Sequence, residues 1–292
     1  MRLPRLLAVL MLAAAGALPA AAAELKPFAD TSRLVTIGGS LTEIVFALGE
    51  NDRLVARDQT AVFPEAALKL PDVGYMRALA PEGVLSVRPT ALLVLEGSGP
   101  PEALDVLNGA GVEYQTVPES FTHTGILRKV EAVGEALGVQ NKAEALMAQI
   151  DADLSAVEAM TKRIGNKKRV LFILSMQGNK IQAAGTGTAA DGIIALGGGI
   201  NSITDYAGYK ALTEEAIIAA APDVILMMDR GGDHAASNAD LFGNPAIALT
   251  PAGRDHKVIR IDGAYLLGFG PRTASAARDL AHAMYADQVP AH

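Results

Sequence analysis

The chain contains the same order of segments twice, and this duplication restricts its fold more than any other feature. Residues 33–39 form a short apolar run that ends in glycine, and residues 169–175 form a second apolar run. Each run predicts a buried strand. Residues 40–49 and 188–197 then each begin with a hydroxyl side chain, carry an acid three residues later and end in glycine. This spacing predicts helices with capping boxes at Ser40 with Glu43 and at Thr188 with Asp191.

The duplication continues in the segments that follow. Residues 74–95 (GYMRALAPEGVLSVRPTALLVL) and 208–228 (GYKALTEEAIIAAAPDVILMM) align with one gap. Glu82 and Pro89 match Glu215 and Pro222, and each proline ends a short helix before an apolar strand. Each half therefore predicts alternating strands and helices. The expected fold class is α/β, with two Rossmann-like lobes that have parallel central sheets and are joined by one long α-helix.

Residues 123–163 lack proline and repeat apolar residues at a spacing of three to four. They predict one long helix, with a kink near Gly138 and an end at Gly165. A final helix is expected after Pro271. The expected organisation is a signal peptide (1–23), an N-terminal lobe (24–122), a connecting helix (123–165) and a C-terminal lobe with its terminal helix (166–292). A helical connector predicts little closure around a ligand held between the lobes.

The N-terminal residues predict export. Arg2 and Arg5 precede an apolar stretch, residues 6–18, and small residues follow up to Ala23. This pattern is typical of a signal peptide cleaved near Ala23, so we expect a periplasmic protein. The chain has no cysteine, which excludes disulfides, thiolate sites and a lipid-anchored cysteine. The net charge of −7 becomes −9 without the signal peptide and disfavours nucleic acid as a partner. We expect a monomer.

Motifs of common enzyme classes do not occur. The chain lacks GxSxG, HExxH, the P-loop and a GxGxxG placed between a strand and a helix. Its five histidines have no i, i+4 spacing, so a histidine metal site is weakly supported. We therefore expect a binding protein and no catalytic residues.

The segment 73–77 (VGYMR) is expected to be a loop at the edge of the first lobe, where binding residues gather. The phenolate of a tyrosine such as Tyr75 is a suitable ligand for ferric iron and a known axial ligand of haem. The guanidinium of Arg77 would favour that anion. Met76 and Leu79 would offer apolar surface to a porphyrin. The alternative is an ordinary loop tyrosine beside a surface arginine.

The chain resembles the haem-binding proteins of bacterial haem ABC importers, a branch of the helix-linked (class III) substrate-binding proteins. The resemblance covers residues 32–286 and is carried by VGYMRALAPEGVLSVRP, AAGTGTAADGIIALGG, YKALTEEAIIAAAPDVIL and LLGFGPRT. It implies that Tyr75 binds the haem iron, that Arg77 lies beside it and that Arg230 approaches from across the cleft. A solvated loop charge is the alternative for Arg230.

The resemblance also bears on the second lobe and on docking. Some members carry a histidine in lobe two, whereas residues 175–179 here have none. This departure implies one five-coordinate haem held through Tyr75, unless Met176 or His234 also approaches the iron. In similar importers, glutamates equivalent to Glu82 and Glu215 pair with arginines of the two permease subunits. The alternative is that each acid only favours its helix N-terminus.

The sequence therefore predicts a carrier that takes ferric haem b as its transported ligand to an ABC permease dimer. Cobalamin or a ferric siderophore on the same fold is the first alternative. The absence of tryptophan and the low aromatic content disfavour the siderophore. A haem-modifying enzyme or chelating protein is the second alternative, and it would need a proton donor or redox partner near the haem.

Overall fold

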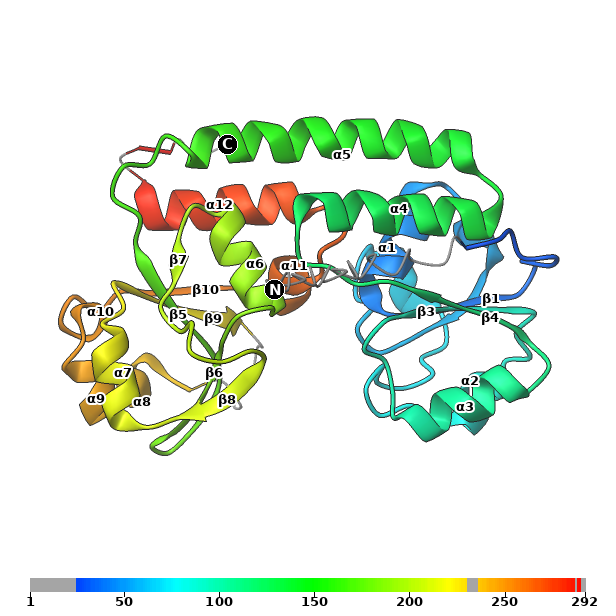
Figure 1. Cartoon of the computed structure of the whole chain (residues 1–292). Coiled ribbons are helices and arrows are strands. Elements are labelled where there is room, and N and C mark those ends of the chain that lie inside the picture. The colour runs from blue at the N-terminus through cyan, green and yellow to red at the C-terminus, as the bar shows by residue number, and fades with distance from the viewer. Residues whose placement is uncertain (1–24, 230–235, 287, 290–292) are drawn as a thin grey trace, which may run out of the picture.

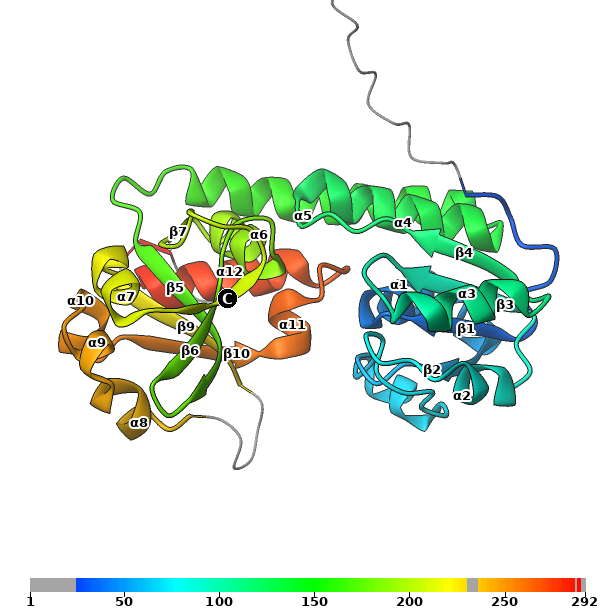
Figure 2. The ribbon, with the colours of Figure 1, turned by 60° about the horizontal axis from the view of Figure 1, so that its bottom comes forward.

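The computed structural model describes residues 25–229, 236–286 and 288–289. They form two α/β lobes beside each other, with helices α4, α5 and α12 lying along one side of the pair (Figure 1). The turned view also separates the lobes, and α5 extends across from one to the other (Figure 2). Among the residues described, we found no helix with the length and apolar character needed to cross a membrane.

The N-terminal lobe contains a four-stranded parallel sheet in the order β2-β1-β3-β4. Its elements are β1 (Leu34–Ile37), α1 (Gly39–Ala47), η1 (Asn51–Arg53), β2 (Leu54–Arg57), η2 (Glu65–Lys69), α2 (Pro81–Ser86), β3 (Ala91–Leu95), α3 (Pro101–Gly109) and β4 (Glu113–Val117). Strands β1 and β3 are fully or almost fully buried, as expected for apolar runs covered on both faces.

The C-terminal lobe contains a sheet in the order β10-β9-β5-β6-β8, with β7 also paired to β5. Its elements are β5 (Arg169–Gln177), β6 (Lys180–Ala184), α6 (Ala189–Leu196), β7 (Ile200–Asn201), β8 (Tyr209–Leu212), α7 (Glu214–Ala220), β9 (Val224–Asp229), α8 (Asn238–Gly243), α9 (Pro245–Ala248), α10 (Pro251–Arg254), β10 (Val258–Asp262), α11 (Gly263–Leu267) and α12 (Thr273–Tyr285).

The strand pairing confirms the α/β class and the duplication. Strand β1 pairs in parallel with β2 and β3, and β5 pairs in parallel with β7 and β9. The registers Leu34↔Ala91 and Val170↔Val224 occupy equivalent places in the two lobes. The predicted helices around Glu82 and Glu215 are α2 and α7, and each precedes the strand that follows its proline.

The second sheet is mixed: its central pairs, β9 with β5 and β10, are parallel as predicted, and an antiparallel part is added at one edge. Strand β6 runs antiparallel to both β5 and β8. Residues 175–179, which we expected to be a binding loop, belong to a hairpin whose turn contains Gly178 at φ 57°. This hairpin is an insertion in the second copy of the repeated unit.

The prediction of one continuous helix over residues 123–165 was wrong. Helix α4 (His123–Leu137) ends at Gly138, which adopts a left-handed conformation (φ 69°), and α5 (Gln140–Thr161) begins two residues later. The two helices lie side by side as a hairpin (Figure 1). Glycine tolerates the left-handed C-cap, so Gly138 reverses the chain instead of kinking a helix. Helix α5 alone extends from one lobe to the other.

The capping box expected at Ser40 does not form. Helix α1 begins one residue earlier, after Gly38, and its start has no side-chain cap. Glu43 instead forms an ion pair with Arg272, 229 positions away in sequence. Thr188 does cap α6 by accepting from the Asp191 N–H, and the Asp191 carboxylate accepts from the Gly187 N–H.

One large hydrophobic core extends through both lobes. It includes β1 and β3, the inner faces of α4, α5, α6 and α12, and Phe172 of β5. A second, smaller core fills the opposite face of the C-terminal sheet against α7, α8 and α9. Because the first core is continuous, the two lobes are held together by buried apolar contacts as well as by the chain connection.

Candidate functional site: the cleft between the lobes

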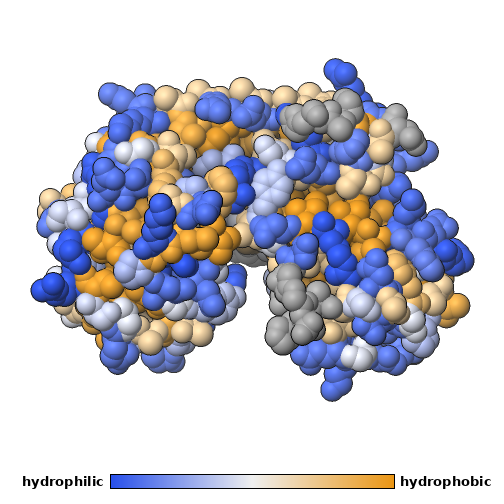
Figure 3. Space-filling model, turned by 180° about the vertical axis from the view of Figure 1, so that it is seen from behind, coloured by the Kyte–Doolittle hydropathy of each residue, from blue (hydrophilic) through white to orange (hydrophobic). Residues whose placement is uncertain are grey.

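The surface of the molecule is hollowed between the two lobes. The space-filling view shows a notch that opens on the side away from α5 (Figure 3). We call this notch the cleft. In open α/β sheets, ligands bind beyond the carboxyl ends of the strands, and the loop after β2 that carries Tyr75 begins at such an end. The cleft is therefore the first place to examine the predicted residues.

Tyr75 and Arg77 lie together, as the spacing predicted. Tyr75 is one of the large hydrophobic residues that stay exposed, with an exposed fraction of 39%. The Arg77 Nη1 atom donates a hydrogen bond to the Tyr75 Oη atom at 3.0 Å. The pair thus presents an oxygen ligand with its own cation at the surface.

Backbone hydrogen bonds hold residues 74–76, which include Tyr75, in place. Three carbonyl groups accept hydrogen bonds of 2.8 Å each: Gly74 from the Gln59 N–H, Tyr75 from the Ala78 N–H, and Met76 from the Gly99 N–H. Gly74 adopts φ 105°, a conformation that favours glycine. The direction in which Tyr75 leaves the chain is consequently fixed by the fold.

A buried carboxylate organises the same loop from below. Asp58 is fully buried, and its carboxylate accepts from the Gly38 N–H at 2.9 Å and from the Thr60 N–H at 2.9 Å. It also accepts from the Thr60 hydroxyl. Burial raises the pKa of Asp58, and these hydrogen bonds, together with the backbone N–H of Met76, oppose that shift. No sequence pattern indicated this role, because Asp58 lies 17 positions before Tyr75.

Met76 does not face a ligand. Its side chain is 5% exposed and belongs to the hydrophobic core of the N-terminal lobe, and so does Leu79. Side chains that alternate along the loop point in opposite directions, so the exposed Tyr75 is followed by a buried neighbour. The expectation that Met76 and Leu79 would offer apolar surface to a porphyrin is therefore corrected.

Tyr209, the first residue of β8, was missed by the sequence analysis. Its side chain is 39% exposed, and its ring lies 6.5 Å from the ring of the buried Phe172. Burial of the phenol raises the pKa of Tyr209, and the charge of Arg77 lowers it. Arg77 and Tyr209 belong to different lobes, so this charge acts across the cleft. The repeated Gly-Tyr pair, at 74–75 and 208–209, was a signal that could have identified it.

An ion pair joins the lobes through the GFGPRT segment. Arg272 donates from Nε and Nη2 to the Glu43 Oε2 atom at 3.0 and 2.9 Å. Its guanidinium also lies 3.7 Å from the ring centroid of Phe63 and 5.2 Å from that of Tyr265. Such charge-assisted and stacked contacts are strong when they are partly buried. Phe63 is 42% exposed, so an aromatic surface adjoins this contact.

A second connection between the lobes is a buried amine. The Lys129 Nζ atom donates to Glu119 at 2.7 Å, to the Phe269 carbonyl at 3.0 Å and to the Ser40 hydroxyl at 3.3 Å. Burial lowers the pKa of Lys129 and raises the pKa of Glu119. Together the two sets of contacts fix α1 of the N-terminal lobe against the segment that precedes α12.

Glu82 and Glu215 lie at equivalent places on the two lobes. Each is an exposed residue in the first turn of its helix, α2 or α7. Both helices lie at the ends of the lobes that are far from α5 (Figure 1). Hydrogen bonding to the backbone and to Thr213 lowers the pKa of Glu215. The structure thus leaves both carboxylates accessible to another protein.

The other predicted residues contribute less. Arg230 and His234 lie outside the described residues, so the prediction for Arg230 stays a prediction. Met176 is half-buried in β5 and packs against the smaller core. Within the described ranges, no cluster of three histidine, aspartate or glutamate side chains suits a metal ion. A tyrosine that binds the iron of a cargo does not need such a cluster.

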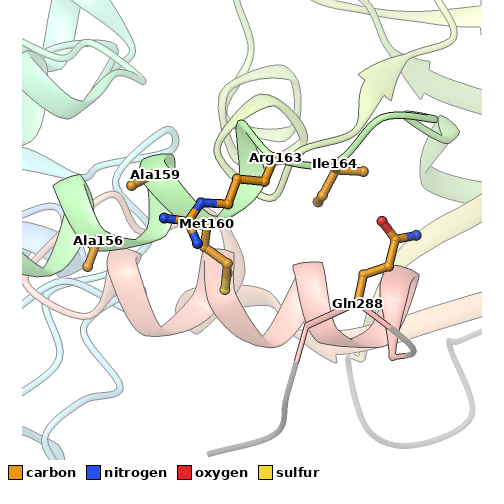
Figure 4. Close-up of a pocket in the computed structure, with 6 residues that line it drawn as sticks. All are labelled: Ala156, Ala159, Met160, Arg163, Ile164 and Gln288. Carbon is orange, nitrogen blue, oxygen red and sulfur yellow. The ribbon is translucent and has the colours of Figure 1, made fainter.

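Two shallow pockets lie elsewhere. One, of about 370 Å³, lies between the ends of α5 and α12 and is lined by Ala156, Ala159, Met160, Arg163, Ile164 and Gln288 (Figure 4). The other, of about 380 Å³, lies beside His123, which contacts Asp151 and Glu158. Neither includes Tyr75 or Arg77. The open cleft is therefore a better candidate than these pockets, because only the cleft combines the tyrosine, its arginine and a facing aromatic residue.

Two α/β lobes joined by a helix, with exposed polar and aromatic groups facing across a cleft, define a two-lobed substrate-binding protein. The chain belongs to the periplasmic binding protein family, whose model matches residues 34–265. This membership identifies a binding protein and agrees with the expectation that the chain is not an enzyme.

Two solved structures of heme-binding proteins are similar to this chain over most of its length. The periplasmic heme-binding protein BhuT, in complex with two hemes, is 39% identical, with a TM-score of 0.82 over 88% of this chain and 98% of BhuT. The periplasmic heme-binding protein RhuT from Roseiflexus sp. RS-1 is also 39% identical, with a TM-score of 0.83 over 88% and 99% of the two chains. A vitamin B12-binding protein of Yersinia pestis is 34% identical, but over only 38% of this chain and 36% of that protein.

Proposed function

We propose that this protein is a periplasmic carrier that binds haem in the cleft between its lobes and delivers it to an ABC importer. The observation that carries the proposal is the exposed Tyr75 hydroxyl with the Arg77 guanidinium 3.0 Å away. Likeness to heme-binding proteins over nearly the whole described chain supports this choice of cargo. The haem is bound in its ferric state, because phenolate oxygen is a hard anionic ligand that prefers Fe(III).

Capture follows from the chemistry of the pair. A free tyrosine has a pKa near 10, so the phenolate needs stabilisation at neutral pH. Coordination to ferric iron supplies most of that stabilisation, and the hydrogen bond from Arg77 supports the remaining charge. Arg230 is proposed to approach the cargo from the other lobe. One haem is held with Tyr75 as its axial ligand.

Delivery uses the two exposed glutamates. Glu82 and Glu215 are fixed on separate lobes that share one core, so their separation is set by the fold. Each is proposed to pair with an arginine of one permease subunit, which gives register and a faster association. Glu82→Ala combined with Glu215→Ala should leave haem binding unchanged and stop haem transport in vesicles that contain the permease. Transport at the unaltered rate would exclude these residues from docking.

Residues 1–23 are proposed to direct export and to be removed near Ala23. The curated relative YvrC of Bacillus subtilis, 26% identical over 88% of this chain, is described as a lipoprotein. The present chain has no cysteine to carry such a lipid. Mass spectrometry of the protein purified from the periplasm should therefore give a mass that begins at Glu24 without added lipid.

Cobalamin is the second candidate cargo, because a vitamin B12-binding protein matches a third of the chain. A titration separates the candidates. Purified protein is mixed with ferric haem, cobalamin or a ferric siderophore, and the visible spectra are followed over time. A stable ferric high-spin spectrum with haem alone supports the proposal. Binding of cobalamin without haem would overturn it, and bleaching of the haem would indicate an enzyme.

Tyr75 is tested in the same assay. Tyr75→Phe retains the ring and removes the ligating oxygen, so the charge-transfer band of the ferric complex should disappear and affinity should fall. Arg254→Ala is a suitable control, since Arg254 is an exposed residue of α10 whose guanidinium donates to the Leu249 carbonyl of the same lobe. An unchanged spectrum in Tyr75→Phe would remove Tyr75 from the site.

A further inference from the structure

Each lobe carries a tyrosine at the same place in the repeated unit. Tyr75 lies in the connection from β2 to α2, and Tyr209 lies in the connection from β7 to α7. Each follows a glycine with positive φ, Gly74 at 105° and Gly208 at 79°. Both side chains are 39% exposed. The duplication has therefore placed two half-exposed tyrosines in corresponding positions, one on each lobe.

The two tyrosines are held in different ways. The Tyr75 hydroxyl accepts a hydrogen bond from the Arg77 guanidinium. Burial raises the pKa of Tyr209, and the Thr188 side chain, the Arg77 charge and the Ala190 N–H oppose that shift. Because Thr188 and Ala190 lie at the start of α6, the Tyr209 hydroxyl lies against its own lobe, and the part of Tyr209 that remains for a ligand is its ring.

The Tyr209 ring is also supported from behind. The ring of Phe172, which is fully buried in β5, meets it edge to face at 6.5 Å. The pairing of β8 with β6 fixes its backbone through the register Ala184↔Tyr209. A rigid aromatic ring that is exposed on one side and supported on the other is well suited to pack against a planar aromatic ligand.

We infer that Tyr209 is the residue of the C-terminal lobe that packs against the face or edge of the bound porphyrin, while Tyr75 alone supplies the iron ligand. This inference rests on the proposed function. It assigns different tasks to two tyrosines that the repeat makes equivalent: coordination in the N-terminal lobe and recognition of the flat ring in the C-terminal lobe.

The experiment compares two cargoes with four variants, three at Tyr209 and one at Tyr75. Ferric haem can be coordinated through its iron, whereas metal-free protoporphyrin IX can only be held by packing and polar contacts. Tyr209→Ala should weaken both ligands about tenfold and leave the spectrum of bound ferric haem unchanged. Tyr209→Phe keeps the ring and should bind both ligands like the original protein. Tyr75→Phe should weaken haem far more than protoporphyrin.

The outcomes distinguish the inference from the function it rests on. Failure of the unaltered protein to bind ferric haem would overturn the proposed function itself. Haem binding that is unaffected by Tyr209→Ala would overturn only the role of Tyr209. Loss of the charge-transfer band in Tyr209→Phe would also overturn it, by making Tyr209 an iron ligand. Tyr209→Leu, which keeps apolar volume at the edge of β8, should weaken both cargoes if the aromatic ring matters, and circular dichroism checks the fold of every variant.

Discussion

Asp58 shows at the scale of single residues how the Tyr75 loop obtains its shape. Its carboxylate accepts from the N–H groups of Gly38 and Thr60, and the Met76 N–H of the Tyr75 loop lowers its pKa against the effect of burial. The Tyr75 backbone therefore has its direction before any ligand arrives. Partners that orient a metal ligand in this way commonly matter for affinity although they never contact the metal.

The first prediction concerns this carboxylate. Asp58→Asn keeps the shape of the side chain but turns an N–H₂ group toward N–H donors, so the loop should lose its fixed direction. Affinity for ferric haem should fall by roughly 10- to 100-fold, measured by visible titration. Leu107→Ala, a buried change in α3, is the matched control: it should lower stability and leave the haem spectrum intact. Equal affinity in Asp58→Asn would contradict the role.

A second prediction follows from Tyr265. Burial and the hydrogen bond to Asp279 raise the pKa of Tyr265 to about 12, against about 10 in an unfolded chain. A raised pKa in the folded state means that this contribution to stability is complete below pH ~10 and is lost as the pH rises toward ~12. The free energy of unfolding should therefore fall over this range more steeply in the original protein than in Tyr265→Phe. Parallel pH profiles would contradict it.

Gly138 shows why apolar spacing alone did not define the helices between the two repeated units. Apolar spacing in residues 123–163 correctly predicted helices, but it could not separate one long helix from a hairpin. The decisive property is the left-handed backbone of Gly138, which depends on packing of α4 against α5.

The left-handed backbone of Gly138 predicts whether an alanine at this position raises or lowers the stability. Alanine in place of glycine inside a helix would stabilise the protein by about 1 kcal/mol. At the left-handed C-cap of α4, Gly138→Ala should instead destabilise it by about 1–2 kcal/mol. Urea unfolding followed by circular dichroism measures the change. A more stable variant would show that the helix continues through this position.

The same contrast explains which elements the sequence could predict. Local patterns located β1, α1, α2, β3, α6, α7, β9 and α12, because each is set by its own apolar run and its proline or glycine. The Ser40 capping box failed because Glu43 binds Arg272 from the other end of the chain. Tyr75 and Arg77 were predicted from adjacent positions, whereas Asp58 and Tyr209 act from distant segments that only folding brings near.

At the scale of the whole molecule, the two lobes are connected by one hydrophobic core and by buried polar contacts. Lys129 of α4 binds both Glu119 and the Phe269 carbonyl, and Arg272 binds Glu43. These contacts support the expectation of little closure around the cargo. Small-angle scattering curves with and without haem should nearly coincide, and a large domain rotation on loading would contradict a stiff connection.

The buried amine gives the corresponding stability prediction. The Lys129 side chain is fully buried and that of Glu119 is 12% exposed. Lys129→Met should lower the free energy of unfolding by roughly 3–5 kcal/mol, because it leaves a buried carboxylate without its cation. Adding Glu119→Gln should recover much of that loss. A single variant as stable as the original protein would show that the buried amine of Lys129 does not stabilise the fold.

The central claim is that an oxygen atom of residue 75 binds the iron of haem between the lobes. A crystal structure of the protein loaded with ferric haem tests it most directly. The account predicts the iron bound to Tyr75 Oη, with Arg77 still beside that oxygen and the porphyrin between the two lobes. A porphyrin bound elsewhere, or a Tyr75 ring directed into solvent with no bond to iron, would contradict it.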